Sequence, residues 1–191
     1  MPKLMIAYGS NLNKRAMKVR CPTAKPIGKF MLTGAKLVFR GVADVECSPD
    51  GKVPCGLWLI NRADEAALDR YEGAPHMYYK EEGIVLKYAG RPQNALIYLM
   101  RSDCVYPPSQ HYVDTIRKGY KDFGLDESYL DEAIKASFEK SPDEQTTSRR
   151  ERQKADKRQR RLVEVPEAVV RRRLAMRGAD LVTGGLTETG S

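Results

Sequence analysis

With 191 residues, the chain is long enough to bury the hydrophobic core of one domain, with room for an additional segment. Hydrophobic residues make up 41% of it, and no run approaches the ~20 consecutive apolar residues that span a bilayer. The formal net charge of +8 is spread unevenly, since eight Lys and Arg residues gather between positions 149 and 161. The apolar run Leu4–Ala7 is too short for a secretory signal, so we expect a cytoplasmic protein that does not enter a membrane.

The first elements in chain order are a strand and a short helix. The apolar segment Leu4–Tyr8 predicts a buried strand. Asn13–Arg20 predicts a helix, with Asn11 or Asn13 as its N-cap and Cys21-Pro22 as its end.

The next segment predicts two strands and a second helix. Gly28–Phe39 carries a strand pattern, Asp50-Gly51 is typical of a turn, and Val53–Ile60 resumes as a strand. Asn61 is then the expected N-cap of a helix over Arg62–Tyr71.

Two strands and two helices complete the expected domain. The strands are predicted to pair as a hairpin around Gly90-Arg91-Pro92, and Gly124 is expected to cap the first helix at its C-terminal end. The predicted strands are Tyr78–Lys87 and Asn94–Met100, and the predicted helices are Ser109–Phe123 and Asp126–Lys140. We therefore expect one α+β domain over residues 1–140.

Residues 141–191 differ in composition and are expected to form a basic, partly helical extension. Ser141–Ser148 is polar and predicts a linker or bend, whereas Arg149–Val165 is highly charged and compatible with a helix. Pro166–Met176 predicts a further short helix, and Leu181–Ser191 is rich in Gly and Thr and is expected to fray.

The four cysteines are expected to be free thiols. Cys21, Cys47, Cys55 and Cys104 form no Cys-x-x-Cys pair, and no cluster of histidines accompanies them. We therefore expect neither a zinc site nor a disulfide framework.

Two short motifs are the main candidates for function. Tyr8-Gly9-Ser10-Asn11-Leu12 directly follows the first predicted strand, and such a turn presents backbone N–H groups that can hold an anion. Glu72 stands at the end of a predicted helix, immediately before Gly73-Ala74-Pro75, where its carboxylate can act as a fixed base. Together the motifs predict a cradle of hydrogen-bond donors facing a proton acceptor.

Each motif also has an interpretation without function. The Tyr-Gly-Ser-Asn segment fits an ordinary strand-to-helix turn, and Glu72 fits a solvated helix end. Asp69 is a rival carboxylate one helical turn earlier, and Ser10 lacks the Gly-x-Ser-x-Gly context of a nucleophile. The histidines, His76 and His111, each flank a motif and are expected to be polar residues at the rim.

A third motif, Pro107-Pro108-Ser109-x-x-Tyr112, completes a set that resembles the γ-glutamylcyclotransferases. The three motifs occur in the same order as in that family and at compatible separations. The resemblance extends over roughly residues 4–130 and leaves the basic extension outside. It implies a small mixed or barrel-like β-sheet flanked by helices.

The resemblance also implies a reaction. Enzymes of this family cleave a γ-glutamyl amide when the α-amino group of the substrate attacks its own γ-carbonyl, which yields 5-oxoproline and a free amine. Glu72 matches the catalytic glutamate of the family, and the backbone N–H groups of residues Gly9, Ser10, Asn11 and Leu12 match its anion cradle. Tyr112 matches a tyrosine that contacts substrate, Tyr8 and Tyr78 are candidate pocket walls, and no cofactor is required.

The identity of the partner stays open at the level of the sequence. The leaving group fits a small amine, an amino acid, or a group carried on a larger acidic protein, since basic surface would help such a carrier dock. In an alternative of a different class, the protein is a non-catalytic member of the fold that binds partners or nucleic acid through the basic extension. Nucleic acid is the less favoured ligand, because the extension lacks interleaved aromatic residues and any known binding motif.

Overall fold

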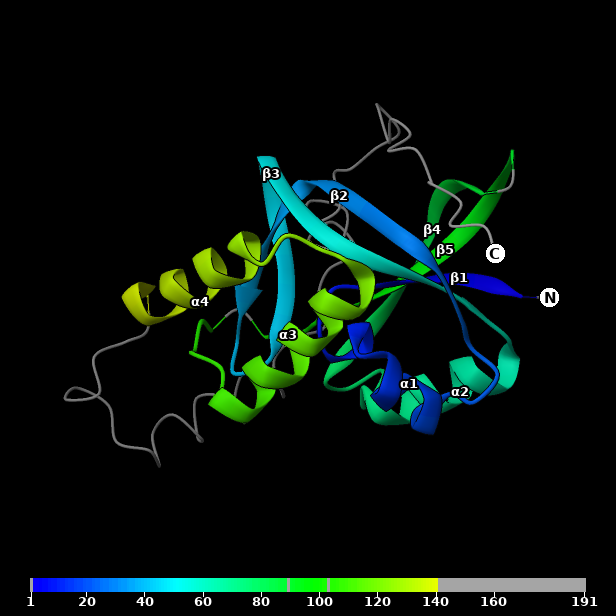
Figure 1. Cartoon of the computed structure of the whole chain (residues 1–191), viewed down its shortest axis with the longest axis horizontal. Coiled ribbons are helices and arrows are strands. Elements are labelled where there is room, and N and C mark those ends of the chain that lie inside the picture. Colours follow the sequence, from blue (N-terminus) through cyan, green and yellow to red (C-terminus); the bar gives the residue numbers. More distant parts are fainter. Residues whose placement is uncertain (1, 89, 103, 141–191) are drawn as a thin grey trace.

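A computed structural model describes residues 2–88, 90–102 and 104–140 and shows one mixed β-sheet with four α-helices around it (Figure 1). This arrangement confirms the predicted α+β class. The expectations for residues 141–191 lie outside the described residues. In the described part, no helix combines the length and the apolar character needed to cross a membrane.

The sheet has five strands in the order β2-β3-β1-β5-β4. β1 therefore lies in the centre, antiparallel to β3 and parallel to β5, while the outer pairs β2–β3 and β4–β5 are antiparallel. The predicted hairpin of β4 and β5 is confirmed. The strand bounds are Lys3–Ala7 for β1, Lys25–Phe39 for β2, Ala43–Ile60 for β3, Tyr78–Tyr88 for β4 and Arg91–Met100 for β5.

The prediction of a chain-reversing turn at Asp50-Gly51 is wrong. The chain reverses ten residues earlier, at residues 40–42, where Arg40 N donates to the Val42 carbonyl over 2.8 Å. Asp50-Gly51 lies inside β3 instead, where the register with β2 jumps from Thr33↔Lys52 to Ala35↔Cys47. The turn-forming residues thus lie in a β-bulge, where β3 has more residues than the paired segment of β2, and β3 continues on both sides of the bulge.

The helices begin and end close to the predicted residues. The helix bounds are Lys14–Arg20 for α1, Arg62–Tyr71 for α2, Gln110–Phe123 for α3 and Ser128–Lys140 for α4. Asn13 and Asn61 cap α1 and α2 through their side chains, and Gly124 ends α3 in the left-handed region at φ 60°. These three caps confirm the local signals in the sequence.

The helices divide into two groups around the sheet. α1 and α2 contact each other, and Figure 1 shows them together below β1, whereas α4 contacts β2 on the other side. α3 packs on a single 3-10 turn, η1 (Ser10–Leu12), which directly follows β1. The segment between β1 and α1 therefore packs on strands β1 and β3 of the sheet and on helix α3.

Candidate active site

A cavity opens where β1 ends, and seven elements or their connections contribute to its wall. β1 ends beside the start of β3, the end of α2, and residues from β4, β5 and α3. The lining residues are Ile6, Ala7, Tyr8, Gly9, Ser10, Asn11, Ala43, Glu72, Tyr78, Tyr98 and Tyr112. The cavity therefore combines one carboxylate, four phenols and a turn of backbone N–H groups.

The turn at the floor of the cavity comes close to its neighbours. A Cβ at Gly9 would lie 3.1 Å from Ala43 Cβ and 3.3 Å from the Tyr112 hydroxyl, so glycine allows this approach. Leu12 N–H donates to the Gly9 carbonyl over 2.9 Å, and its side chain is fully buried. The N–H of Leu12 thus closes the 3-10 turn, and of the four predicted cradle residues only Gly9, Ser10 and Asn11 line the cavity.

Glu72 reaches the cavity because helix α2 stops there. Glu72 is the C-cap of α2, and Gly73 follows at φ +61°, a left-handed conformation that turns the chain away. Residue Glu72 is only 9% exposed, and its Oε1 accepts a hydrogen bond of 2.7 Å from Asn11 Nδ2. Burial raises the pKa of Glu72, while the Asn11 hydrogen bond and the charge of Arg20 lower it, and the net change is upward.

Two of the four phenols are fixed by the first residue of β3. Ala43 N–H donates to the Tyr112 hydroxyl over 3.1 Å, and the Ala43 carbonyl accepts from the Tyr78 hydroxyl over 2.9 Å. Burial raises the pKa of Tyr112 to about 12 and raises that of Tyr78 further. Both hydroxyls are therefore neutral near neutral pH. The Tyr78 proton is donated to Ala43, whereas the Tyr112 hydroxyl accepts from Ala43 and retains its proton to donate.

A buried ion pair holds Ala43 in this place. The carboxylate of Asp44, the next residue, accepts a hydrogen bond from Arg40 Nε at 2.8 Å and another from the Met100 N–H at 3.0 Å. The side chains of Asp44 and Arg40 are both almost fully buried. The pair joins the reversal between β2 and β3 to the end of β5. It thereby positions the two phenol contacts without lining the cavity itself.

The other two phenols connect the cavity to β5. The Tyr8 hydroxyl donates to the Tyr98 carbonyl, and the Tyr98 hydroxyl donates to Asp69 Oδ1 over 2.7 Å. Asp69, the rival carboxylate, also pairs with Lys80 at 3.3 Å and does not line the cavity. Of the two acidic residues at the end of α2, only Glu72 therefore faces the space where a substrate would lie.

The comparisons with known proteins agree with this arrangement. A family model described as gamma-glutamyl cyclotransferase, AIG2-like matches residues 5–120, well over half of the chain. The chain belongs to this family.

Curated relatives and a solved structure extend the match. A human gamma-glutamylcyclotransferase is 32% identical over 146 residues, covering 70% of this chain and 77% of the relative. A cattle gamma-glutamylcyclotransferase is 30% identical over 139 residues, covering 66% of this chain and 74% of the relative. A solved structure titled gamma-glutamyl cyclotransferase superimposes with a TM-score of 0.61 at 27% identity, covering 78% of this chain and 93% of that chain.

The fold of this cyclotransferase-family chain brings most of the predicted site residues to one cavity. Tyr8, Gly9, Ser10, Asn11, Glu72, Tyr78 and Tyr112 all line it, and Leu12 does not. His76 and His111 are exposed and do not line it, and Ser10 Oγ contacts the Tyr71 hydroxyl at 3.2 Å. Strand pairing also brings to the cavity two residues that the motifs did not indicate, Tyr98 and Ala43. The one signal in the sequence for Tyr98 was the presence of a tyrosine within the apolar run of β5.

In residues 2–88, 90–102 and 104–140, no three His, Cys, Asp or Glu side chains are grouped so that they could hold a metal ion. The four cysteines form no disulfide with one another, and Cys21 and Cys55 are buried, which raises the pKa of Cys21 to about 11. The expectation of a cofactor-free reaction remains a prediction.

Proposed function

We propose that this protein is a γ-glutamylcyclotransferase that releases 5-oxoproline and a free amine from a γ-glutamyl amide. The observation that carries the proposal is the position of Glu72, a buried acidic residue that lines the same cavity as the turn of residues 9–11 and contacts Asn11 of that turn. The family match supports the same activity.

In the proposed reaction, Glu72 acts as base and then as acid and forms no covalent bond with the substrate. Its carboxylate takes a proton from the α-ammonium group, whose nitrogen then bonds to the γ-carbonyl carbon of the same glutamyl unit. The bond from this carbonyl carbon to the leaving nitrogen breaks as Glu72 returns the proton to that nitrogen. The second proton that the ring nitrogen loses in becoming the lactam N–H also passes to the leaving nitrogen, so the amine departs as an ammonium. A pKa raised by burial suits both steps, and holding the glutamyl chain in a near-attack geometry contributes up to ~7–11 kcal/mol in favourable cases.

The backbone N–H groups of Gly9, Ser10 and Asn11 are the proposed donors to the charge that develops on the γ-carbonyl oxygen or to the substrate's α-carboxylate. Tyr112, whose hydroxyl accepts from Ala43 N–H, keeps its own proton for a substrate oxygen. Losing one well-placed donor to an oxyanion commonly costs ~10²–10³-fold in turnover. Tyr8 and Tyr78 form walls around the glutamyl chain in this proposal.

The decisive experiment measures 5-oxoproline by mass spectrometry after incubation of the full chain with a panel of γ-glutamyl compounds. The panel contains glutathione, γ-glutamyl-alanine, γ-glutamyl-ε-lysine and a γ-glutamylated acidic carrier protein. We expect release from at least one compound, and Glu72→Gln should lower the rate by ~10²–10⁴-fold because the acid–base group is gone.

Asp69→Asn is the matched control, since it neutralises the other carboxylate of the same helix end and keeps an acceptor for Tyr98. This variant should retain most of the activity. Full activity in Glu72→Gln, or an equal loss in both variants, would refute the role of Glu72. A panel without any 5-oxoproline release would refute the proposed activity.

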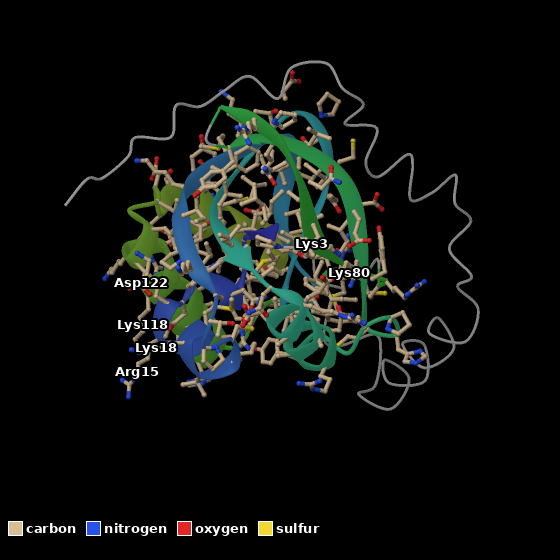
Figure 2. The ribbon with its side chains drawn as sticks, turned by 90° about the vertical axis from the view of Figure 1, so that its right-hand side faces the viewer. Lys3, Arg15, Lys18, Lys80, Lys118 and Asp122 are labelled. Carbon is tan, nitrogen blue, oxygen red and sulfur yellow. The ribbon has the colours of Figure 1, made fainter. Side chains whose placement is uncertain are left out.

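The carrier-protein substrate tests a separate part of the proposal, which concerns the partner. Arg15 and Lys18 on α1 and Lys118 on α3 are exposed, and Figure 2 shows all three on the same side of the molecule. If a carrier presents the γ-glutamyl group, its release should fall steeply as salt increases, whereas release from a free dipeptide should not.

A further inference from the structure

Glu72 is linked to a cation on α1 through a single side chain. Asn11 Nδ2 donates to Glu72 Oε1, and Asn11 Oδ1 accepts from Arg20 Nη1. Arg20 is the last residue of α1, and its guanidinium carbon lies 3.2 Å from the centre of the Tyr71 ring. Since Tyr71 directly precedes Glu72, this stacking contact holds the cation beside the helix end that carries the carboxylate.

The contact with Arg20 decides which way the Asn11 amide points. A guanidinium group has only N–H donors, so the amide oxygen must face Arg20 and the amide NH₂ must face Glu72. The reversed amide would bring two donors together on one side and two oxygens together on the other. The backbone carbonyl of Asn11 also accepts a hydrogen bond of 3.0 Å from Trp58 Nε1. This contact fixes the backbone from which the side-chain amide extends.

The remaining ionisable groups around Glu72 are phenols. Tyr8, Tyr78, Tyr98 and Tyr112 line the same cavity, and burial raises the pKa of each, so they stay neutral. Tyr71 contacts Ser10 on the other side of the turn, and Asp44 is paired with Arg40 behind Ala43. Among the described residues, the groups that favour the charged form of Glu72 are the Asn11 amide and Arg20.

We infer that Arg20 is a positioning residue that fixes the Asn11 amide as a donor to Glu72 and favours the ionised form of that carboxylate. The inference rests on the proposed function only in that Glu72 is taken to be the base. Burial alone would leave the carboxylate protonated over a wider pH range, and a protonated carboxyl group cannot accept the proton of the α-ammonium. Arg20 thus extends activity toward lower pH without touching the substrate.

A merely structural role for Arg20 makes a different prediction. If stacking on Tyr71 served only to join α1 to α2, replacing Arg20 would lower stability and leave the titration of Glu72 unchanged in the molecules that remain folded. The test must therefore measure the proton affinity of Glu72 itself.

The experiment records the titration of the Glu72 side-chain carbon by NMR in full-length protein labelled at glutamate, with Glu72→Gln identifying the signal. A graded series separates charge from hydrogen bonding: Arg20→Lys keeps a charged donor, Arg20→Gln keeps a neutral donor, and Arg20→Met keeps neither. Arg15→Gln is the control, because it removes an exposed charge from the same helix.

We expect the titration midpoint of Glu72 to be lowest in the wild type and to rise from Arg20→Lys through Arg20→Gln to Arg20→Met. In Arg15→Gln the midpoint should stay at the wild-type value. The acidic limb of the kcat/KM profile for 5-oxoproline release should move upward in the same order. An unchanged midpoint in folded Arg20→Gln or Arg20→Met would overturn the inference. The NMR readout needs no substrate, so a shifted midpoint without any activity would refute the proposed function and leave the role of Arg20 standing.

Discussion

Glu72 combines burial with a raised pKa, and this combination costs folding free energy at neutral pH. Because the pKa in the folded state exceeds the ordinary value of 4.5, the folded protein binds the proton more tightly than the unfolded chain. The contribution of Glu72 to stability is therefore full below the unfolded pKa and is lost as pH rises through the folded pKa. A proposed catalytic group of this kind opposes stability where it is ionised.

We predict that Glu72→Gln is at least as stable as the wild type at neutral pH. The neutral amide fits nearly the same volume, keeps an oxygen for Asn11 Nδ2, and removes the buried charge. Thermal unfolding at neutral and mildly acidic pH checks this. The advantage of the variant should shrink as the pH falls through the folded pKa of Glu72 and be gone below the ordinary value of 4.5. A variant that melts well below the wild type at neutral pH would show that the charged hydrogen bond to Asn11 outweighs the cost of burial.

At the same scale, the sequence indicated the residues that lie in contiguous motifs and missed those that reach the site through tertiary contacts. Glu72 and Tyr8–Asn11 were predictable because each occurs in a short, recognisable segment. The amide of Asn11 meets Glu72 across 61 positions of sequence, and Ala43 meets Tyr112 across 69. No local pattern encodes such pairs, because they depend on how the strands are ordered.

Helix α3 positions the cavity floor through a contact that leaves no room for a side chain. A Cβ at Gly119 would lie 2.4 Å from Leu12 Cβ and 2.7 Å from Asn13 N, so the helix packs directly on the backbone of η1. Gly119 itself does not line the cavity. The position of the proposed cradle thus depends on a residue of a neighbouring element.

We predict that Gly119→Ala lowers both stability and 5-oxoproline release. Helix propensity alone would favour alanine by ~0.5–1 kcal/mol, so a loss would identify the contact with η1 as its cause. Lys118→Ala is the matched control, because Lys118 is the exposed neighbour in the same helix. Urea unfolding together with steady-state rates provides the measurement, and a stabilised, fully active Gly119→Ala would contradict the close packing.

Element boundaries were predictable where capping residues mark them and less so within the long hairpin. Asn61 and Gly124 specify their helix ends by local hydrogen bonds and backbone conformation. Asp50-Gly51 carries an equally strong turn signal, yet it becomes a bulge, because the paired strands on both sides continue the sheet. Pairing between distant segments outweighed the local preference there.

For the molecule as a whole, the cavity draws on residues between positions 6 and 112, and the basic extension lies outside both this range and the family match. We predict that removing residues 141–191 leaves 5-oxoproline release from a free dipeptide unchanged. The same truncation tests the alternative in which the extension binds nucleic acid. Salt-dependent retention on nucleic acid that disappears on truncation would support that alternative, and a large loss of dipeptide turnover would show that the extension contributes to the site.

The central place of β1 has a consequence for how the protein is made. β1 precedes both of its partners in the chain, and its parallel partner β5 begins only at Arg91. During synthesis, the apolar strand therefore leaves the ribosome long before its second edge can be covered, and an uncovered edge of this kind is prone to pair with other chains. The turn that follows it is seated later still, when Gly119 emerges. Nascent chains that already contain Glu72 should accordingly be inactive and in need of protection by chaperones.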